Sequence, residues 1–168
     1  MEKWGDKPYH SLDYENKKRF GEKVYKISLA GGTTCPNRDG TLGTRGCCFC
    51  SGSGSGDFAA TKGSITEQIE EAIARVSRYK NAGHHFTAYF QSFTATYAPV
   101  ETLRAAWEEA MTHESVVTLA IATRPDCLGD DVLSLLADCC RKMPMTVELG
   151  LQTIHPDTIR YIRRGYPN

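Results

Sequence analysis

Residues 145–153 read MTVELGLQT, and the alternation in this stretch decides between two folds that the rest of the chain allows. On a strand, Val147, Leu149 and Leu151 would share one face, and the polar or small residues between them would share the other. An apolar face suits packing under helices, and a polar or small face suits the lining of a cavity. The stretch therefore favours part of a (β/α) barrel over an open, doubly wound sheet.

Three further strands are predicted upstream, at residues 23–30, 86–92 and 116–124. In residues 116–124 the pattern repeats, because Leu119 and Ile121 oppose smaller or more polar neighbours. Strands that alternate with helices predict a parallel sheet joined by right-handed crossovers. We therefore expect an α/β fold with about four βα units of a barrel.

Helical patterns follow the predicted strands. A Ser-Ile-Thr-Glu capping box opens a helix at residues 64–81. Pro99 opens the next helix, Asp130 is predicted to cap a third, and Pro156 begins a short one.

The domain organisation follows from these elements. Residues 1–22 are predicted to be an extended leader, and residues 23–168 to be the core domain. The sequence stops where another helix should start, so we expect a truncated chain or a fragment, with the barrel incomplete at its C-terminal side.

Composition narrows the function classes. The 168 residues carry 20 basic and 20 acidic side chains, so no overall charge favours nucleic acid or an anionic membrane. The longest apolar runs are far shorter than the roughly 20 residues that cross a bilayer. The N-terminus lacks the apolar segment of a secretion signal, which predicts a cytoplasmic, reducing location. Metal ligation is then a better interpretation of the seven cysteines than disulfides.

Cys35, Cys47 and Cys50 form a C-x11-C-x2-C pattern in a glycine-rich loop, residues 31–63. Three thiolates on a four-iron cluster leave one iron free to bind another molecule. The alternative is a zinc site, but structural zinc takes four ligands, and no second C-x2-C or nearby histidine pair is present. Cys48 is interpreted as a bystander, because only Cys47 leaves the two-residue gap to Cys50.

Residues 26–50, KISLAGGTTCPNRDGTLGTRGCCFC, resemble the opening of the YhcC-like radical S-adenosylmethionine (SAM) proteins, relatives of the Elongator catalytic subunit group. The segments YFQSFTATYAP, IATRPD and ELGLQTIHPDTIRYIRRGY resemble later parts of the same family, so the similarity covers nearly the whole chain. Two features depart from the superfamily pattern: the first cysteine spacing is longer than usual, and Gln91, Ser92 and Phe93 replace its frequent Gly-Gly-Glu.

The resemblance implies a radical SAM core domain with two cofactors. Cys35, Cys47 and Cys50 would hold a [4Fe–4S] cluster, and the cluster would cleave SAM to methionine and a 5′-deoxyadenosyl radical. Phe49 occupies the place of an aromatic residue that packs near the SAM adenine. A reductant such as flavodoxin or ferredoxin is implied as a partner. The substrate is not identified; some relatives modify tRNA, although a neutral chain gives little support for that partner.

The other candidate site residues come from the predicted strand ends, where the active sites of β/α barrels gather. Arg124 would pair with the SAM carboxylate, with an ordinary strand-end salt bridge as the alternative. Glu148 would accept hydrogen bonds from the ribose hydroxyls, because a buried carboxylate without a role is costly. Gln91 or Ser92 would accept from the SAM amino group. Gln152 completes the set of expected cofactor-binding residues.

Two other segments are predicted to have no catalytic role. Arg160, Arg163 and Arg164 are predicted to lie on a solvated helix face. Residues 51–56, SGSGSG, lack the lysine of a phosphate-binding loop and are predicted to provide flexibility. The rival to the enzyme hypothesis is a non-catalytic domain that binds zinc or an iron–sulfur cluster, or an inactive fragment.

Overall fold

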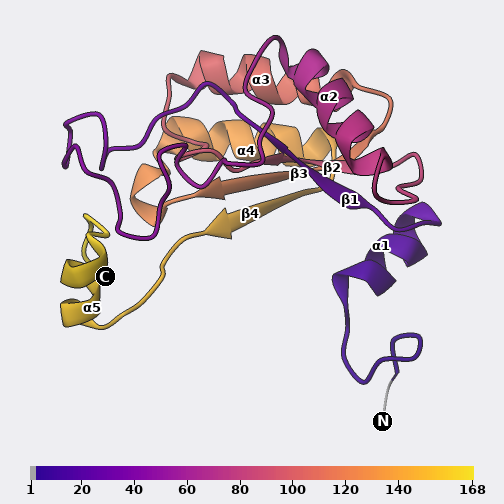
Figure 1. The fold of residues 1–168 in the computed structure, drawn as a ribbon, viewed down its shortest axis with the longest axis horizontal. Helices are drawn as coiled ribbons and strands as arrows, with labels where there is room; N and C mark the ends of the chain where they lie inside the picture. The colour runs from indigo at the N-terminus through magenta and orange to yellow at the C-terminus, as the bar shows by residue number, and fades with distance from the viewer. Residues whose placement is uncertain (1–2) are drawn as a thin grey trace.

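Four parallel strands form one sheet in a computed structural model that describes residues 3–168. They lie side by side in chain order: β1 (Tyr25–Leu29), β2 (Phe86–Phe90), β3 (Val116–Thr123) and β4 (Met145–Leu149) (Figure 1). The register aligns their C-terminal ends, since Leu29 lies opposite Phe90 and Thr123 lies opposite Leu149. The predicted α/β class and parallel sheet are confirmed, and closure into a barrel stays a prediction.

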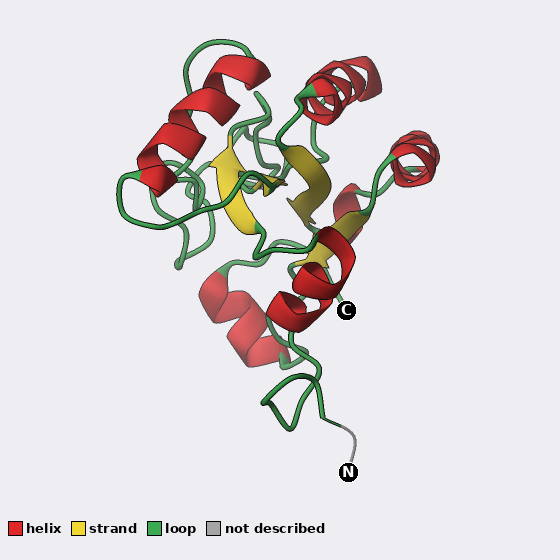
Figure 2. Ribbon diagram, turned by 90° about the vertical axis from the view of Figure 1, so that its right-hand side faces the viewer, coloured by secondary structure: helices red, strands yellow, loops and turns green. Residues whose placement is uncertain are grey.

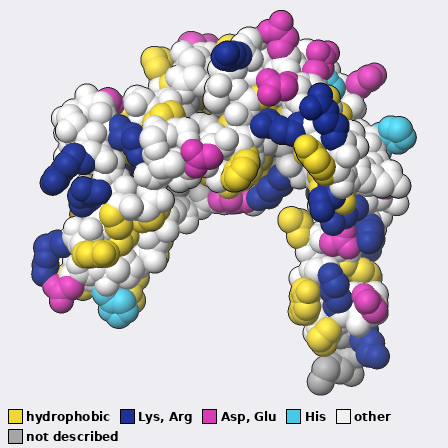
Figure 3. Space-filling view, in the orientation of Figure 1, with side chains coloured by type: hydrophobic (Ala, Val, Ile, Leu, Met, Phe, Trp, Pro, Cys, Tyr) yellow, Lys and Arg dark blue, Asp and Glu magenta, His cyan; other side chains and the backbone are white. Residues whose placement is uncertain are grey.

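Three helices cover one face of the sheet: α2 (Ile65–Ser77), α3 (Val100–Thr112) and α4 (Asp130–Lys142) (Figures 1 and 2). Alternate strand residues and the apolar stripes of these helices meet in a single core. The opposite face is hollowed, and the molecule has the outline of an arch (Figure 3). The largest fully buried apolar side chains are Trp107, Phe86, Phe90, Ile27, Leu29, Ile69, Leu103, Leu119, Ile121 and Leu135.

Strand β4 departs from the expected covering of its apolar face. Val147, Leu149 and Leu151 are 36%, 54% and 44% exposed. The next helix, α5 (Pro156–Ile162), has only seven residues and lies beyond the C-terminal end of β4 instead of across its face (Figure 1). The prediction that helices bury this face holds for β3 and is wrong for β4.

The helix ends agree with most of the predicted signals. The capping box is confirmed, because Ser64 Oγ accepts from the Glu67 N–H and Glu67 accepts from the Ser64 N–H. The helix ends at Ser77, four residues earlier than predicted. The expected cap at Asp130 is wrong: Gly129 is the N-cap, and Asp130 is the first helical residue.

The leader is not wholly extended, because residues 12–20 form helix α1 (Leu12–Phe20). Its local signals explain the correction. Ser11 accepts from the Tyr14 N–H at the N-terminus, and Gly21 ends the helix in a left-handed conformation with φ of 79°. The first two leader residues lie outside the described part of the chain. Among residues 3–168, no helix has the length and apolar character needed to span a bilayer.

Candidate functional site

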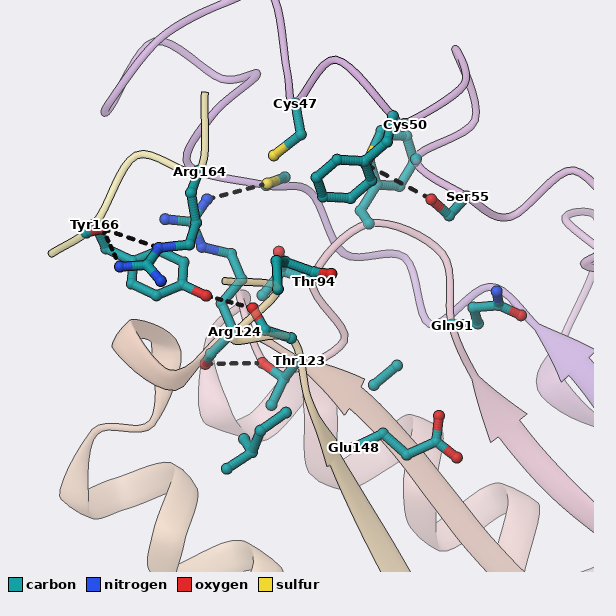
Figure 4. Close-up of a pocket in the computed structure, with 18 of the residues that line it drawn as sticks. Cys47, Cys50, Ser55, Gln91, Thr94, Thr123, Arg124, Glu148, Arg164 and Tyr166 are labelled. Carbon is teal, nitrogen blue, oxygen red and sulfur yellow. Dashed lines mark hydrogen bonds between the residues drawn. The ribbon is translucent and has the colours of Figure 1, made fainter. Parts of the chain in front are cut away.

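A cavity of about 310 Å³ lies over the C-terminal ends of β2, β3 and β4 (Figure 4). The loop at residues 31–63 forms one wall, and residues 164–166 contribute to another. A single 3-10 turn, η1 (Pro125–Cys127), follows β3 at the same end of the sheet. The predicted site residues that line this cavity are Cys35, Cys47, Phe49, Cys50, Gln91, Arg124, Glu148 and Gln152.

Each of the three predicted cysteine ligands has its own hydrogen-bond donor. Arg124 Nη1 lies 3.7 Å from Cys35 Sγ, Asn37 Nδ2 lies 3.2 Å from Cys47 Sγ, and Ser55 Oγ lies 3.6 Å from Cys50 Sγ. Donors aimed at sulfur stabilise the thiolate, which is the form that binds metals. Asn37 and Ser55 belong to the cysteine loop itself, and Arg124 comes from the end of β3, 89 residues from Cys35.

The Cys47 and Cys50 thiols also interact with each other. The hydrogen bond from Cys47 lowers the pKa of Cys50 to about 6, with Ser55 and the Arg38 charge acting in the same direction. The same bond, together with burial, raises the pKa of Cys47. Of these two thiols, Cys50 therefore loses its proton more easily than Cys47.

The sequence predicts Cys35, Cys47 and Cys50 as ligands of one cluster, and all three line the same cavity. Across residues 3–168, no three or more His, Cys, Asp or Glu side chains are gathered closely enough to hold one metal ion. A zinc ion needs its sulfur ligands at about 2.3 Å from one point. An iron–sulfur cluster instead binds its thiolates on different irons, so the sulfurs stand further apart around a larger body. The role of Cys35, Cys47 and Cys50 as ligands of such a cluster stays a prediction.

Cys48 is exposed and does not line the cavity. Its backbone N–H donates to Ile162 O at 3.1 Å. Cys48 is therefore outside the lining that the other three cysteines share, and its interpretation as a bystander stays a prediction.

Arg124 forms a strand-end salt bridge, the alternative that the sequence left open. Its Nε and Nη2 donate to the two carboxylate oxygens of Asp126 at 2.9 and 2.7 Å. Burial alone would lower the pKa of Arg124, but the bonds to Asp126 raise the pKa above its ordinary value. The guanidinium is thus a fixed positive charge beside Cys35, and its contact with SAM stays a prediction.

Glu148 lies on the hollow face of the sheet between two partners that the sequence analysis missed. Lys26 of β1 pairs with one carboxylate oxygen, and the Tyr89 hydroxyl of β2 donates to the other at 2.7 Å. Burial alone would raise the pKa of Glu148, but these two bonds hold the pKa below its ordinary value. The strand alternation could have found both partners, because Lys26 and Tyr89 interrupt apolar strands at inward positions.

The remaining predicted residues differ in position. Phe49 is half exposed at the cavity, and Gln152 adopts a left-handed φ of 67°. Ser92 does not line the cavity: it is buried against Gly56, and its Oγ has no hydrogen-bond partner among the described residues. The structure therefore groups Gln91 with the cysteines but does not group Ser92 with them.

The SGSGSG loop is closely packed, which corrects the expectation of flexibility. A Cβ on Gly54 would lie 2.4 Å from the Phe93 ring, and Gly54 has a left-handed φ of 62°. The Phe93 N–H also donates to Gly54 O at 2.8 Å. Two of these glycines therefore allow close approach to the end of β2 instead of providing a flexible linker.

Arg164 is buried, so its predicted place on a solvated helix face is wrong. Its exposed fraction is 1%, and its guanidinium donates to the carbonyl oxygens of Leu151, Thr153 and Tyr166. Tyr166 lies between two guanidinium groups, 4.9 Å from that of Arg124 and 4.2 Å from that of Arg164. Arg160, in contrast, is exposed and pairs with Asp157.

Two bacterial proteins are similar in sequence to this chain. YtqA of Bacillus subtilis is 45% identical over 167 residues, which cover 96% of this chain and 50% of YtqA. YhcC of Escherichia coli is 42% identical over 150 residues, covering 89% of this chain and 47% of YhcC. The chain is related to YtqA and YhcC. The predicted resemblance to YhcC-like proteins is confirmed, and the chain spans about half the length of these relatives.

One further relative and one solved structure extend the similarity. MJ0486 of Methanocaldococcus jannaschii is 32% identical over 154 residues, which cover 89% of this chain and 46% of MJ0486. The archaeal Elp3 of Methanocaldococcus infernus, truncated at its N-terminus, matches 86% of this chain and 32% of its own, with a TM-score of 0.52 and 16% identity. At that identity the likeness shows the fold alone. None of the protein-family models matches the chain.

Proposed function

We propose that this chain is the cluster-binding part of a radical SAM enzyme, with Cys35, Cys47 and Cys50 as the ligands of a [4Fe–4S] cluster. The observation that carries the proposal is the set of three cysteines on one cavity wall, each with a separate donor to its sulfur. When bound, such a cluster supplies the electron that splits SAM into methionine and a 5′-deoxyadenosyl radical. The relation to YhcC and the fold shared with Elp3 support this assignment.

The cavity residues would bind and orient SAM beside the cysteines. Phe49 offers an exposed aromatic face for the adenine, and Gln91 offers an amide oxygen for the amino group. Arg124 supplies positive charge for the carboxylate while Asp126 keeps its guanidinium in one orientation. Lys26 and Tyr89 orient Glu148 toward a ribose hydroxyl. Gln152 completes the polar lining.

Two partners belong to the same proposal. A small electron-transfer protein of the flavodoxin or ferredoxin type would reduce the site. The substrate that loses a hydrogen atom would enter from the hollow face of the sheet, which is open in the described residues (Figure 3). Binding of tRNA is the less favoured substrate proposal, because the chain carries no net charge.

Anaerobic reconstitution with iron and sulfide tests the proposal. We expect a brown protein with about four irons per chain that forms 5′-deoxyadenosine from SAM when dithionite is added. Cys35→Ala, Cys47→Ala and Cys50→Ala should each lose most of the iron. Cys48→Ala is the matched control and should keep it, because its side chain lies outside the cavity lining. Full iron in all three cavity variants would reject the proposal.

A non-catalytic metal domain gives a different result in the same experiment. Colourless protein that holds one zinc ion per chain, with no 5′-deoxyadenosine, would favour that rival. A brown protein without SAM cleavage would indicate that the part of the relatives that this chain does not cover is needed for activity. The full-length YtqA protein is assayed in parallel. Cleavage of SAM by YtqA but not by this chain would show that the chain lacks a part needed for activity, and no cleavage by either protein would favour the non-catalytic rival.

A further inference from the structure

Asn37 lies in the loop between the first two cysteines and is 95% buried, with an exposed fraction of 5%. Its Nδ2 lies 3.2 Å from Cys47 Sγ, 2.8 Å from Arg163 O and 3.0 Å from Arg164 O. One amide group therefore contacts a cysteine sulfur and the backbone at the end of α5. Its two hydrogens are shared among three acceptors, so the Nδ2 donor has no hydrogen left for water.

The segment at residues 162–165 fits tightly against this amide. A Cβ on Gly165 would lie 2.2 Å from Asn37 Oδ1, and Gly165 has a left-handed φ of 85°. Cys47 Sγ itself lies 3.5 Å from Arg163 O, and the Cys48 N–H donates to Ile162 O. The short Cys47–Cys48 stretch is thus held from two sides, by Asn37 and by the backbone that follows α5.

We propose that Asn37 is a positioning residue for Cys47, and this inference rests on the proposed cluster. Its amide fixes the Cys47 sulfur at the cavity wall and supplies an N–H···S bond to it. Hydrogen bonds to the sulfurs of an iron–sulfur site stabilise its reduced, more negative form and raise its reduction potential. Asn37 would therefore affect both the retention of iron and the ease with which the site accepts an electron.

The test compares Asn37→Ala with Asn168→Ala in the 168-residue chain. Asn168 is the matched control, because it bonds to Arg164 and to Ile154 O in the same terminal segment without contacting a sulfur. In reconstituted protein, we expect Asn37→Ala to lower the ratio of reduced to oxidised cluster about tenfold at a fixed potential, equivalent to about 59 mV for one electron. Loss of more than half of the iron at unchanged thermal stability would also support the proposal. Asn168→Ala should match the wild type.

A second readout needs no cluster. In the metal-free protein, we expect iodoacetamide to alkylate Cys47 about fivefold more slowly in Asn37→Ala than in the wild type, because the reacting thiolate loses its N–H donor. Cys139, which is 1% exposed in the core, should stay protected and reports on folding. If Asn37→Ala exposes Cys139, Asn37→Asp replaces it, because this variant keeps the side-chain size and removes the N–H donors.

The two readouts separate this inference from the proposed function. Unchanged potential, iron content and alkylation in Asn37→Ala would overturn the role of Asn37 while leaving the cluster intact. Equal shifts in Asn37→Ala and Asn168→Ala would also overturn it, because they would reflect loosening of the terminal segment. A wild type that binds no iron but shows the selective change at Cys47 would reject the cluster and keep the positioning contact.

Discussion

Glu148 connects three strands through two side chains, because it accepts from Lys26 of β1 and from Tyr89 of β2 while it belongs to β4. Lys26 Nζ also lies 4.3 Å from the centroid of the Tyr89 ring. Burial, with the bond to Glu148, raises the pKa of the Tyr89 hydroxyl, so this group stays a donor at neutral pH. The Glu148 carboxylate is the acceptor that holds Lys26 and Tyr89 together.

Glu148→Gln should destabilise the chain near neutral pH and have little effect in acid. The pKa of Glu148 is lowered by folding, so its contribution is present above the ordinary value of about 4.3 and is lost as pH falls through the folded-state value. Both Lys26 and Glu148 are more than a third exposed, so solvent screens the pair and we expect about 0.5–1 kcal/mol. Urea unfolding of both proteins from pH 7 to pH 3 measures the difference. A difference that grows toward low pH would contradict the assignment.

At the scale of single residues, the sequence predicts chemistry better than geometry. The spacing of Cys35, Cys47 and Cys50 predicts that they share one site, and they do line one cavity, while their role as ligands stays a prediction. Arg164 and Asn37 were missed, because nothing in their neighbourhoods shows that they contact each other across 127 residues. Ser92 was placed in the site by its position after β2, but the backbone turns its side chain toward Gly56.

At the scale of elements, the glycines of the SGSGSG loop test whether the loop is closely packed, because one of them is crowded and another is not. Gly54→Ala would bring a methyl group into the Phe93 ring at a left-handed backbone position, and we expect a loss of about 1–2 kcal/mol. Gly52→Ala is the control, because a Cβ there meets nothing within 4 Å and its φ is not left-handed. Thermal unfolding of the two variants provides the comparison. Equal melting temperatures would show that this loop is not closely packed.

The helices show why local signals can still be overlooked. Residues 64–67 were recognised because the capping box precedes a strong apolar period. Helix α1 has an equally ordinary cap at Ser11 and a terminal Gly21, but it buries no side chain completely, so no apolar period marks it. Periodicity finds the elements that pack against a core, and α1 is not one of them.

At the scale of the whole molecule, β4 is an exposed edge of the described sheet with an apolar outer face. Unpaired edges with apolar side chains favour association. We expect the sedimentation mass of the chain to rise with concentration, and Val147→Lys to reduce this rise. Leu133→Lys is the control, because Leu133 is an apolar side chain, 47% exposed, that lies on helix α4 and not on the edge strand. An equal effect of both substitutions would exclude the edge as the cause.

The sequence predicts the arrangement of strands and helices where the βα unit repeats. It does not predict the end of the chain, where a short helix replaces the covering helix of the earlier units. Alternation of strands and helices predicted the parallel sheet, since each βα unit repeats the same crossover. The uncovered face of β4 was not predicted, because its residues have the same alternation as those of β3. The difference arises from the short α5, whose position depends on the contacts of residues 162–166 with the cysteine loop.

The contacts between the cysteine loop and the backbone that follows α5 determine when the loop can fold during synthesis. Asn37 bonds to Arg163 O across 126 residues, so the loop cannot adopt its final conformation until the end of α5 has emerged from the ribosome. At the usual rates of translation, the first cysteine would wait roughly 6–25 s for that partner. During this interval the cysteine loop lacks its contact with the backbone that follows α5. Under the proposed function, a cluster would therefore be inserted after translation, when the loop has reached its folded position.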